Sequence, residues 1–121
     1  MKYHPKDPKH LGVPNINFSL TENKDPREKQ YVKQRVERGF DSSELWSLDY
    51  TIARFIIPRL EAFKEEASEV VVIDDIPIDE MLEALRLIVK DGEGEVISVK
   101  DEETITEGLI MLAKHLRALW Y

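Results

Sequence analysis

Histidine and acidic side chains near the N-terminus are the first residues of this chain whose types could bind a metal. His4, Asp7 and His10 offer imidazole and carboxylate ligands of the kind that hold zinc. Pro5 and Pro8 stand between them and prevent a helix from presenting all three on one face. We therefore expect no metal site here, and no other pattern in the chain calls for a cofactor.

Acidic residues also gather between two apolar stretches in the second half of the chain. They are Asp74, Asp75, Asp79 and Glu80. A calcium site needs several oxygens that converge on one point, and this spacing does not match the ligand spacing of a calcium-binding loop. Acids also collect at helix N-termini because the helix dipole favours them there. Solvated acids at a helix start are the favoured interpretation.

Patterns typical of catalysis are missing from the sequence. It has no cysteine, no G-x-S-x-G motif and no glycine-rich phosphate loop. His115 has no catalytic companion except Asp49, and this pair is a candidate buried polar contact that would fix helix register rather than perform chemistry. The alternative for Asp49 is a solvated position at the edge of an apolar stripe. We expect a protein that is not an enzyme.

The charge of the chain is unevenly distributed. The net charge is −7, yet residues 1–40 hold nine Lys or Arg against five Asp or Glu, and residues 41–121 hold eight against nineteen. An acidic body is repelled by nucleic-acid phosphate, and a basic segment can lie on such a body, its own or a neighbour's. No apolar run is long enough to span a bilayer, and the N-terminus lacks the apolar core of a secretory signal. We expect a soluble cytoplasmic protein.

The longest apolar segment, residues 41–67, predicts the element around which the chain is organised. Its apolar residues recur every three or four positions and form two adjacent stripes, so we expect a helix enclosed by others. Pro58 cannot donate to the carbonyl of Arg54, but the apolar spacing continues through Leu60 and Phe63. The sequence therefore predicts one kinked central helix.

Three further helices are expected around this segment. The first covers 26–38 and ends at Gly39, a residue that readily adopts the left-handed conformation. The second covers 79–90, and the last begins near Asp101 or Thr104, where Thr104 and Glu107 have the spacing of a capping box. The expected fold is mainly α: a small helical bundle over residues 25–121 around the kinked central helix.

Two short β-strands are an open alternative within this fold. Residues 70–73 are all β-branched, and 95–99 could pair with them. Four residues do not distinguish a strand from an apolar loop, and two strands alone are marginally stable.

Residues 1–24 are expected to form an extended arm, because their prolines favour extended backbone and no helical or strand period is present. The arm also carries apolar side chains that could dock onto a protein surface. These are Leu11, Val13, Ile16, Phe18 and Leu20. The surface could belong to the same chain or to another copy, and the sequence leaves both open.

Two stretches resemble small uncharacterised proteins of tailed bacteriophages. The first is the W-x-L-D segment Leu45–Asp49, followed by Ile52, Ala53 and Pro58. The second is Glu107–Leu109 with the later Leu119 and Trp120. The resemblance covers about a third of the chain and excludes residues 1–24. It implies a phage or prophage origin, and hence a location in the host cytoplasm or the virion, but it implies no activity and no functional residues.

Protein–protein contact, with self-association, is the function that these observations favour. The expected protein is a non-enzymatic accessory or structural protein whose partner the sequence does not name. The alternative is a nucleic-acid-binding protein whose helix over 26–38 contacts phosphate through Lys29, Lys33 and Arg35.

Overall fold

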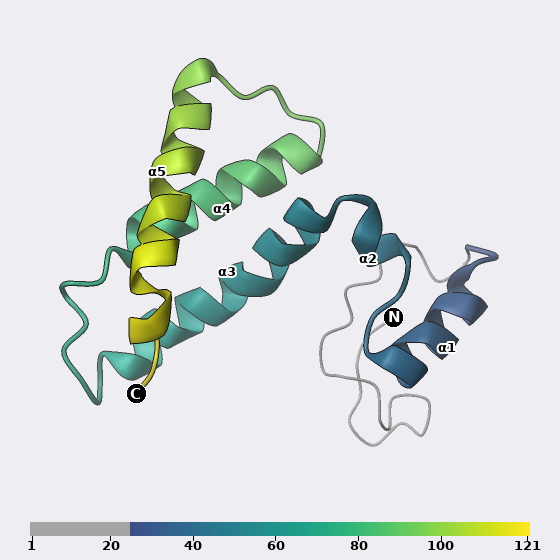
Figure 1. Cartoon of the computed structure of the whole chain (residues 1–121), viewed down its shortest axis with the longest axis horizontal. Coiled ribbons are helices and arrows are strands. Elements are labelled where there is room, and N and C mark those ends of the chain that lie inside the picture. Colours follow the sequence, from purple (N-terminus) through teal and green to yellow (C-terminus); the bar gives the residue numbers. More distant parts are fainter. Residues whose placement is uncertain (1–24) are drawn as a thin grey trace. The chain divides into compact units, whose positions relative to one another are not determined.

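The computed structural model describes residues 25–121, and this part of the chain is mainly helical, as predicted (Figure 1). It contains five α-helices and one short 3-10 helix, and no strand. The elements are α1 (Glu28–Arg38), α2 (Ser43–Trp46), α3 (Leu48–Ala67), α4 (Ile78–Gly92), α5 (Val99–His115) and η2 (Leu116–Ala118). No helix among these residues is long and apolar enough to cross a membrane.

The chain divides into two compact units after Thr51, so that the division falls within α3. The described parts of these units are residues 25–51 and 52–121. The sequence predicted a single helical domain over 25–121.

Helix α1 ends where its sequence predicts. Gly39 has a φ of 87°, and its N–H donates to the carbonyl of Arg35 at 2.9 Å. A left-handed residue in this position closes the helix because only glycine adopts it without steric cost. The helix begins at Glu28, and Asp25 precedes it and accepts a hydrogen bond from the backbone N–H of Arg27 at 2.9 Å.

The central segment is interrupted at Ser47 and not at Pro58. Ser47 has φ −133° and ψ 76°, which is not helical, and it separates α2 from α3. Pro58 lies inside α3, which continues through it as one helix from Leu48 to Ala67. A proline removes one backbone hydrogen bond, and the turns on both sides of Pro58 still keep the helix continuous.

The prediction that the central segment is enclosed on nearly all sides is wrong for its first half. Trp46 is 55% exposed, and Leu45, Leu48 and Ile52 are each about half exposed. Ala53, Leu60 and Ala67, which come later in α3, are buried. A broad apolar surface predicts burial only where enough neighbouring surface exists to cover it, and the described chain covers the later turns.

The core of residues 52–121 is built mainly on one face of α4. Met81, Leu82 and Leu85 recur at helical spacing, are buried, and pack with Leu60 and Ala67 of α3. The neighbouring helices α4 and α5 cross closely (Figure 1).

Gly108 allows this close crossing. A Cβ atom at Gly108 would lie 2.2 Å from the Cβ of Ala84 and 2.7 Å from the carbonyl oxygen of Glu80. Both distances are shorter than real Cβ contacts. The absence of a side chain at this position therefore sets how near α5 comes to α4.

Helix α5 begins earlier than the sequence predicted. Its N-cap is Ser98, whose hydroxyl accepts from the N–H of Asp101, while the Asp101 carboxylate accepts from the N–H of Ser98. The predicted capping residue Thr104 lies within the helix and donates to the carbonyl of Lys100 at 3.1 Å. A capping box needs two residues at the correct spacing and a free helix start. Ser98 with Asp101 and Thr104 with Glu107 both have this spacing, but only the first pair lies at the start of the helix.

The two candidate strands are not formed. Residues 70–73 lie in the loop between α3 and α4, and residues 95–98 lie in the loop between α4 and α5. Ile73 of the first loop is buried, whereas Val70 and Val72 are exposed.

Candidate protein-binding surface

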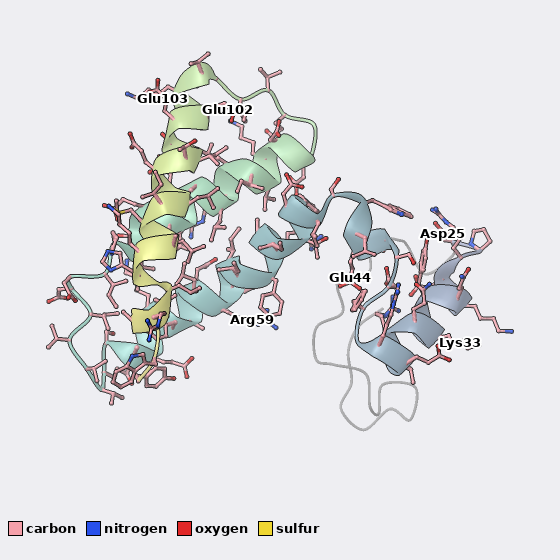
Figure 2. The ribbon with its side chains drawn as sticks, in the orientation of Figure 1. Asp25, Lys33, Glu44, Arg59, Glu102 and Glu103 are labelled. Carbon is pink, nitrogen blue, oxygen red and sulfur yellow. The ribbon has the colours of Figure 1, made fainter. Side chains whose placement is uncertain are left out.

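A cluster of charged side chains occupies the interior of residues 25–51. Arg35 of α1 is 1% exposed and donates from Nη1 to Asp41 Oδ2 at 2.5 Å and from Nη2 to Glu28 Oε1 at 2.7 Å. Asp41 in turn accepts from the backbone N–H of Ser43 at 2.8 Å and from the Ser43 hydroxyl. Glu44 of α2 accepts from the N–H of Asp41 at 2.6 Å. The cluster joins α1 to the residues that start α2, and Figure 2 labels Glu44 within it.

The electrostatics of this cluster follow from its burial. Burial by itself lowers the pKa of the Arg35 guanidinium, but its hydrogen bonds to Glu28 and Asp41 outweigh burial and raise this pKa above the ordinary value. Burial raises the pKa of Glu44, and the N–H of Asp41 opposes that increase only in part. The Nε of Arg35 is buried without a hydrogen-bond partner.

These contacts contradict one residue of the predicted phosphate-binding set. Arg35 is buried and already paired with two carboxylates, so it cannot reach a phosphate in solution. Lys29 and Lys33 are exposed, and Figure 2 labels Lys33. Lys33 Nζ lies 3.9 Å from Glu37 Oε1. A buried arginine with matched carboxylates is an internal ion pair rather than a binding residue.

An arginine also links the start of α1 to Trp46 within residues 25–51. Arg27 donates from Nη2 to Asp25 Oδ2 at 2.8 Å, and its guanidinium carbon lies 4.8 Å from the Trp46 ring centroid. Tyr31 meets the same indole edge-on at a centroid distance of 6.2 Å. The hydrogen bonds from Arg27 hold the pKa of Asp25 at about 2. The cation–π contact with Arg27 and the edge-on contact with Tyr31 hold the Trp46 ring against α1. About half of the Trp46 surface remains exposed.

The predicted acidic cluster lines a cleft at the start of α4. The cleft has a volume of about 490 Å³ and is bounded by Asp74, Asp75, Asp79 and Glu80 together with Lys64 and neighbouring apolar side chains. Lys64 Nζ lies 2.6 Å from Asp79 Oδ1. Within residues 25–121, no three acidic or histidine side chains converge in a way that could hold a metal ion. Asp79 and Glu80 lie in the first turn of α4, where the helix dipole favours acidic side chains.

A second hollow lies between the α3–α4 loop and the end of α5, and we call it the Trp120 groove. It has a volume of about 280 Å³. It is lined by Val71, Val72, Ile73, Asp75, Ile76, His115, Ala118 and Trp120. Val72 is 84% exposed and Trp120 is 72% exposed. Large apolar side chains thus stand open to solvent on both sides of one hollow.

Local structure explains why Val72 and Trp120 are exposed. Ile73 and Ile76 of the loop pack on the core, and Ile76 donates its N–H to the carbonyl of Ile73 at 3.0 Å. This turn anchors the loop and leaves the preceding valines on its outer side. At the other wall, α5 gives way to η2, after which Leu119 packs on the core and Trp120 does not.

Sequence reasoning missed the loop valines as surface residues. It considered residues 70–73 as a strand or an apolar loop and did not predict which of their side chains are exposed. The available signal was the position of the valine run between Glu69 and Asp74, because an apolar run inside an acidic loop has little room for burial.

The remaining predicted site residues fall into two groups. Asp49 is exposed, in agreement with the solvated interpretation, and His115 is half-buried and lines the Trp120 groove. Asp49 and His115 belong to different units, and a contact between them stays a prediction. The metal candidates His4, Asp7 and His10 lie outside the described part of the chain. So do the apolar side chains of the predicted arm, which are Leu11, Val13, Ile16, Phe18 and Leu20.

Comparisons with protein-family models, with curated proteins and with solved structures find no match to this chain.

Proposed function

We propose that this protein is a non-enzymatic accessory or structural protein that works by binding another protein chain through the Trp120 groove. The observation that carries the proposal is the exposure of Val72 and Trp120, which come from two distant segments and line the same hollow. Exposure of apolar side chains to water is unfavourable. Burial of this surface against a partner is favourable by about 25 cal/mol for each Å² of apolar area.

The composition of the groove also fits a protein partner. Binding energy in protein interfaces is concentrated in a few aromatic anchors that sit in pockets, and tryptophan is among the most frequent of them. Here an indole borders aliphatic side chains, and Asp75 and His115 supply polar groups at the same hollow. Large apolar side chains that gather at one exposed site mark interaction sites on many proteins.

The resemblance to small proteins of tailed bacteriophages adds an origin to this proposal. It rests on the W-x-L-D segment Leu45–Asp49 and on the residues around Gly108 and Trp120. A phage or prophage origin predicts phage genes on both sides of the coding sequence, and a genome in which neither neighbour is of phage type would oppose it.

Photo-crosslinking tests the proposed function. The photoreactive amino acid p-benzoylphenylalanine would replace Trp120 in the full chain, expressed in the organism that encodes it. We expect covalent protein adducts, identified by mass spectrometry, because the groove wall faces the partner. The matched control carries the same amino acid at Glu103, an exposed residue of α5. Equal labelling from both positions, or none from Trp120, would oppose the proposal.

A further inference from the structure

We infer that the partner segment at the Trp120 groove is basic, with an apolar side chain that enters the groove and a neighbouring Lys or Arg that meets carboxylates of the α3–α4 loop. This inference rests on the proposed function, and it adds the chemistry of the partner. The observation behind it is the negative charge of the residues that line the groove and the hollows beside it.

The size of the groove favours a side chain of another protein over an enclosed small molecule. The groove has a volume of about 280 Å³. Pockets that enclose a small organic ligand hold roughly 300–1,000 Å³ and bury most of the ligand surface. The Trp120 groove is smaller, and Val72 and Trp120 remain largely exposed beside it. An anchoring side chain presented by a protein can enter such a hollow while its neighbours cover these two residues.

Two further hollows adjoin the groove at the α3–α4 loop. The cleft at the start of α4 shares Ile73, Asp75 and Ile76 with the groove. A third hollow, lined by residues 68–74, shares residues 71–73 with it. The carboxylates that line these three hollows are all exposed, and they are Glu69, Asp74, Asp75, Asp79 and Glu80.

Positive charge is scarce among the same lining residues. Lys64 lines the cleft, but its Nζ lies 2.6 Å from Asp79 Oδ1, so its charge is already matched. Lys114 and Arg117 lie near the end of α5, and neither lines any of the three hollows. Asp75, which lines two of them, takes part in no ion pair with another residue of the described chain. Its charge is therefore available to a partner.

A hollow near the C-terminal end of α4 differs in both respects. Its charged lining residues are balanced in sign, and they are Arg86, Lys90, Glu93 and Glu95. Its apolar lining residues, Ile57 and Val89, are half-buried. This hollow therefore offers neither a large exposed apolar side chain nor an excess of one charge. The Trp120 groove offers the first, and its surroundings offer the second.

The lining charges decide which partner fits the groove. Val72 and Trp120 would accept an apolar side chain from a segment of any charge. Like charges placed opposite each other disfavour association, whereas opposite charges speed encounter and set specificity. These effects act over about 8 Å at physiological ionic strength, a range that includes Asp74 next to Asp75. An acidic segment in the groove would be repelled, and a basic one attracted.

Selection from a peptide library tests this chemistry with the full chain. The probes are short peptides of random sequence displayed on yeast and sorted for binding to the labelled protein. Cells that also bind the variant Val72→Ser/Trp120→Ser are discarded, so the remaining peptides depend on the groove. We expect them to carry an aromatic or large aliphatic residue with Lys or Arg a few positions away. Enrichment of acidic peptides, or no preference for either charge, would overturn the inference.

Neutralisation of the loop carboxylates measures their contribution to binding of a selected peptide made by synthesis. Asp74→Asn/Asp75→Asn removes two charges and nearly preserves side-chain shape, and it should weaken binding by about tenfold at low salt. Added salt should weaken wild-type binding more than binding by this variant. The matched control Glu102→Gln/Glu103→Gln changes two exposed acids of α5 that line none of the three hollows, and it should leave affinity unchanged (Figure 2). Circular dichroism establishes that each variant is folded, and equal affinity of the wild type and Asp74→Asn/Asp75→Asn would contradict the inference.

The crosslinking experiment separates failure of this inference from failure of the proposed function. Adducts from position 120 to an acidic or uncharged segment of another protein would retain the proposed function and reject a basic partner. Absence of adducts, together with no peptide that distinguishes the wild type from Val72→Ser/Trp120→Ser, would reject both. Adducts to a basic segment whose yield decreases in Asp74→Asn/Asp75→Asn support both.

Discussion

Arg35 is held between Glu28 and Asp41 in the interior of residues 25–51, at nitrogen–oxygen distances of 2.7 and 2.5 Å. Two carboxylates and a guanidinium can be buried together because each charge finds an opposite one with good geometry. Removal of one partner leaves the others uncompensated in a poorly solvated place. The cluster is therefore stable as a set and sensitive to each member.

Arg35→Met should destabilise residues 25–51 by about 3–5 kcal/mol, because Asp41 is 0% exposed and loses its cation. Urea unfolding followed by the fluorescence of Trp46, in a Trp120→Phe background, measures this loss. The matched variant Lys33→Met alters an exposed cation of the same helix with an ion-pair distance of 3.9 Å, and its expected cost is below about 0.5 kcal/mol. Similar costs for the two variants would contradict the structural role assigned to Arg35.

Glu44 should make stability depend on pH. Burial raises its pKa in the folded chain above 4.5, its ordinary value. The folded chain therefore holds the Glu44 proton more tightly than the unfolded chain does. The stabilising contribution is complete below the ordinary pKa and declines as pH rises through the raised one.

Glu44→Gln removes this titration and keeps an oxygen that can accept from the N–H of Asp41. The free energy of unfolding of the wild type minus that of Glu44→Gln should therefore decrease as pH increases from about 4 to 7. The same Trp46 fluorescence assay measures both proteins at each pH. A difference that is constant or increases over this range would show that the carboxyl is not destabilised by burial.

At the scale of elements, small residues and helix starts decide how α4 and α5 are placed. The Cβ of Ala84 faces Gly108 across the closest approach of these helices. Gly108→Ala gains about 1 kcal/mol of helix propensity, but its methyl group must displace Ala84 and the backbone of Glu80. We expect a net loss of about 2 kcal/mol in the unfolding free energy measured by circular dichroism in urea.

A double-mutant cycle checks that the clash is the cause. Ala84→Gly removes the methyl group that Gly108→Ala would meet at 2.2 Å, although the contact with the Glu80 carbonyl remains. The double variant should therefore lose less stability than the sum of the two single variants. Strict additivity would indicate that α5 does not approach α4 at this residue.

The start of α5 offers a test between the predicted and observed caps. Ser98→Ala should cost about 1 kcal/mol, because the N–H of Asp101 loses its acceptor. Thr104→Ala should cost nothing, because Thr104 lies inside the helix and alanine has the higher helix propensity. Thermal unfolding followed by circular dichroism ranks the two, and the reverse order would place the helix start at Thr104.

At the scale of the whole molecule, the two units are stabilised by different kinds of interaction. The buried apolar core of the described chain is formed by residues of 52–121, with α4 at its centre. The buried residues of 25–51 are mostly polar or charged and surround Arg35. Loss of the ion-pair cluster and loss of apolar packing should therefore affect different parts of the chain.

Hydrogen exchange measured by mass spectrometry tests this separation. In Arg35→Met, the amides of α1 and α2 should exchange faster, while those of α4 and α5 keep their wild-type rates. In Gly108→Ala the pattern should reverse. Equal acceleration throughout the chain in either variant would mean that the two units unfold together.

The local features of this fold could be read from residue order, because they depend on neighbours only a few positions apart. The sequence predicted helices over 26–38, over 79–90 and near the C-terminus, and Gly39 marked the end of the first. The break at Ser47 was not predicted, and the start at Ser98 was missed because Thr104 and Glu107 offer a competing capping box close by on the chain. Their choice depends on which backbone groups the rest of the fold satisfies.

By itself, the sequence determined a mainly helical chain with an acidic second part, because helical periodicity and charge are properties of residue order. Only the tertiary structure decided which of its charged and apolar side chains meet water. Arg35 became an internal ion pair because Glu28 and Asp41 come to it from positions seven and six residues away, respectively. Val72 and Trp120 became the walls of one groove although 48 positions separate them, because the core anchors Ile73 and Leu119 beside them. Burial depends on such distant packing, and no local pattern contains it.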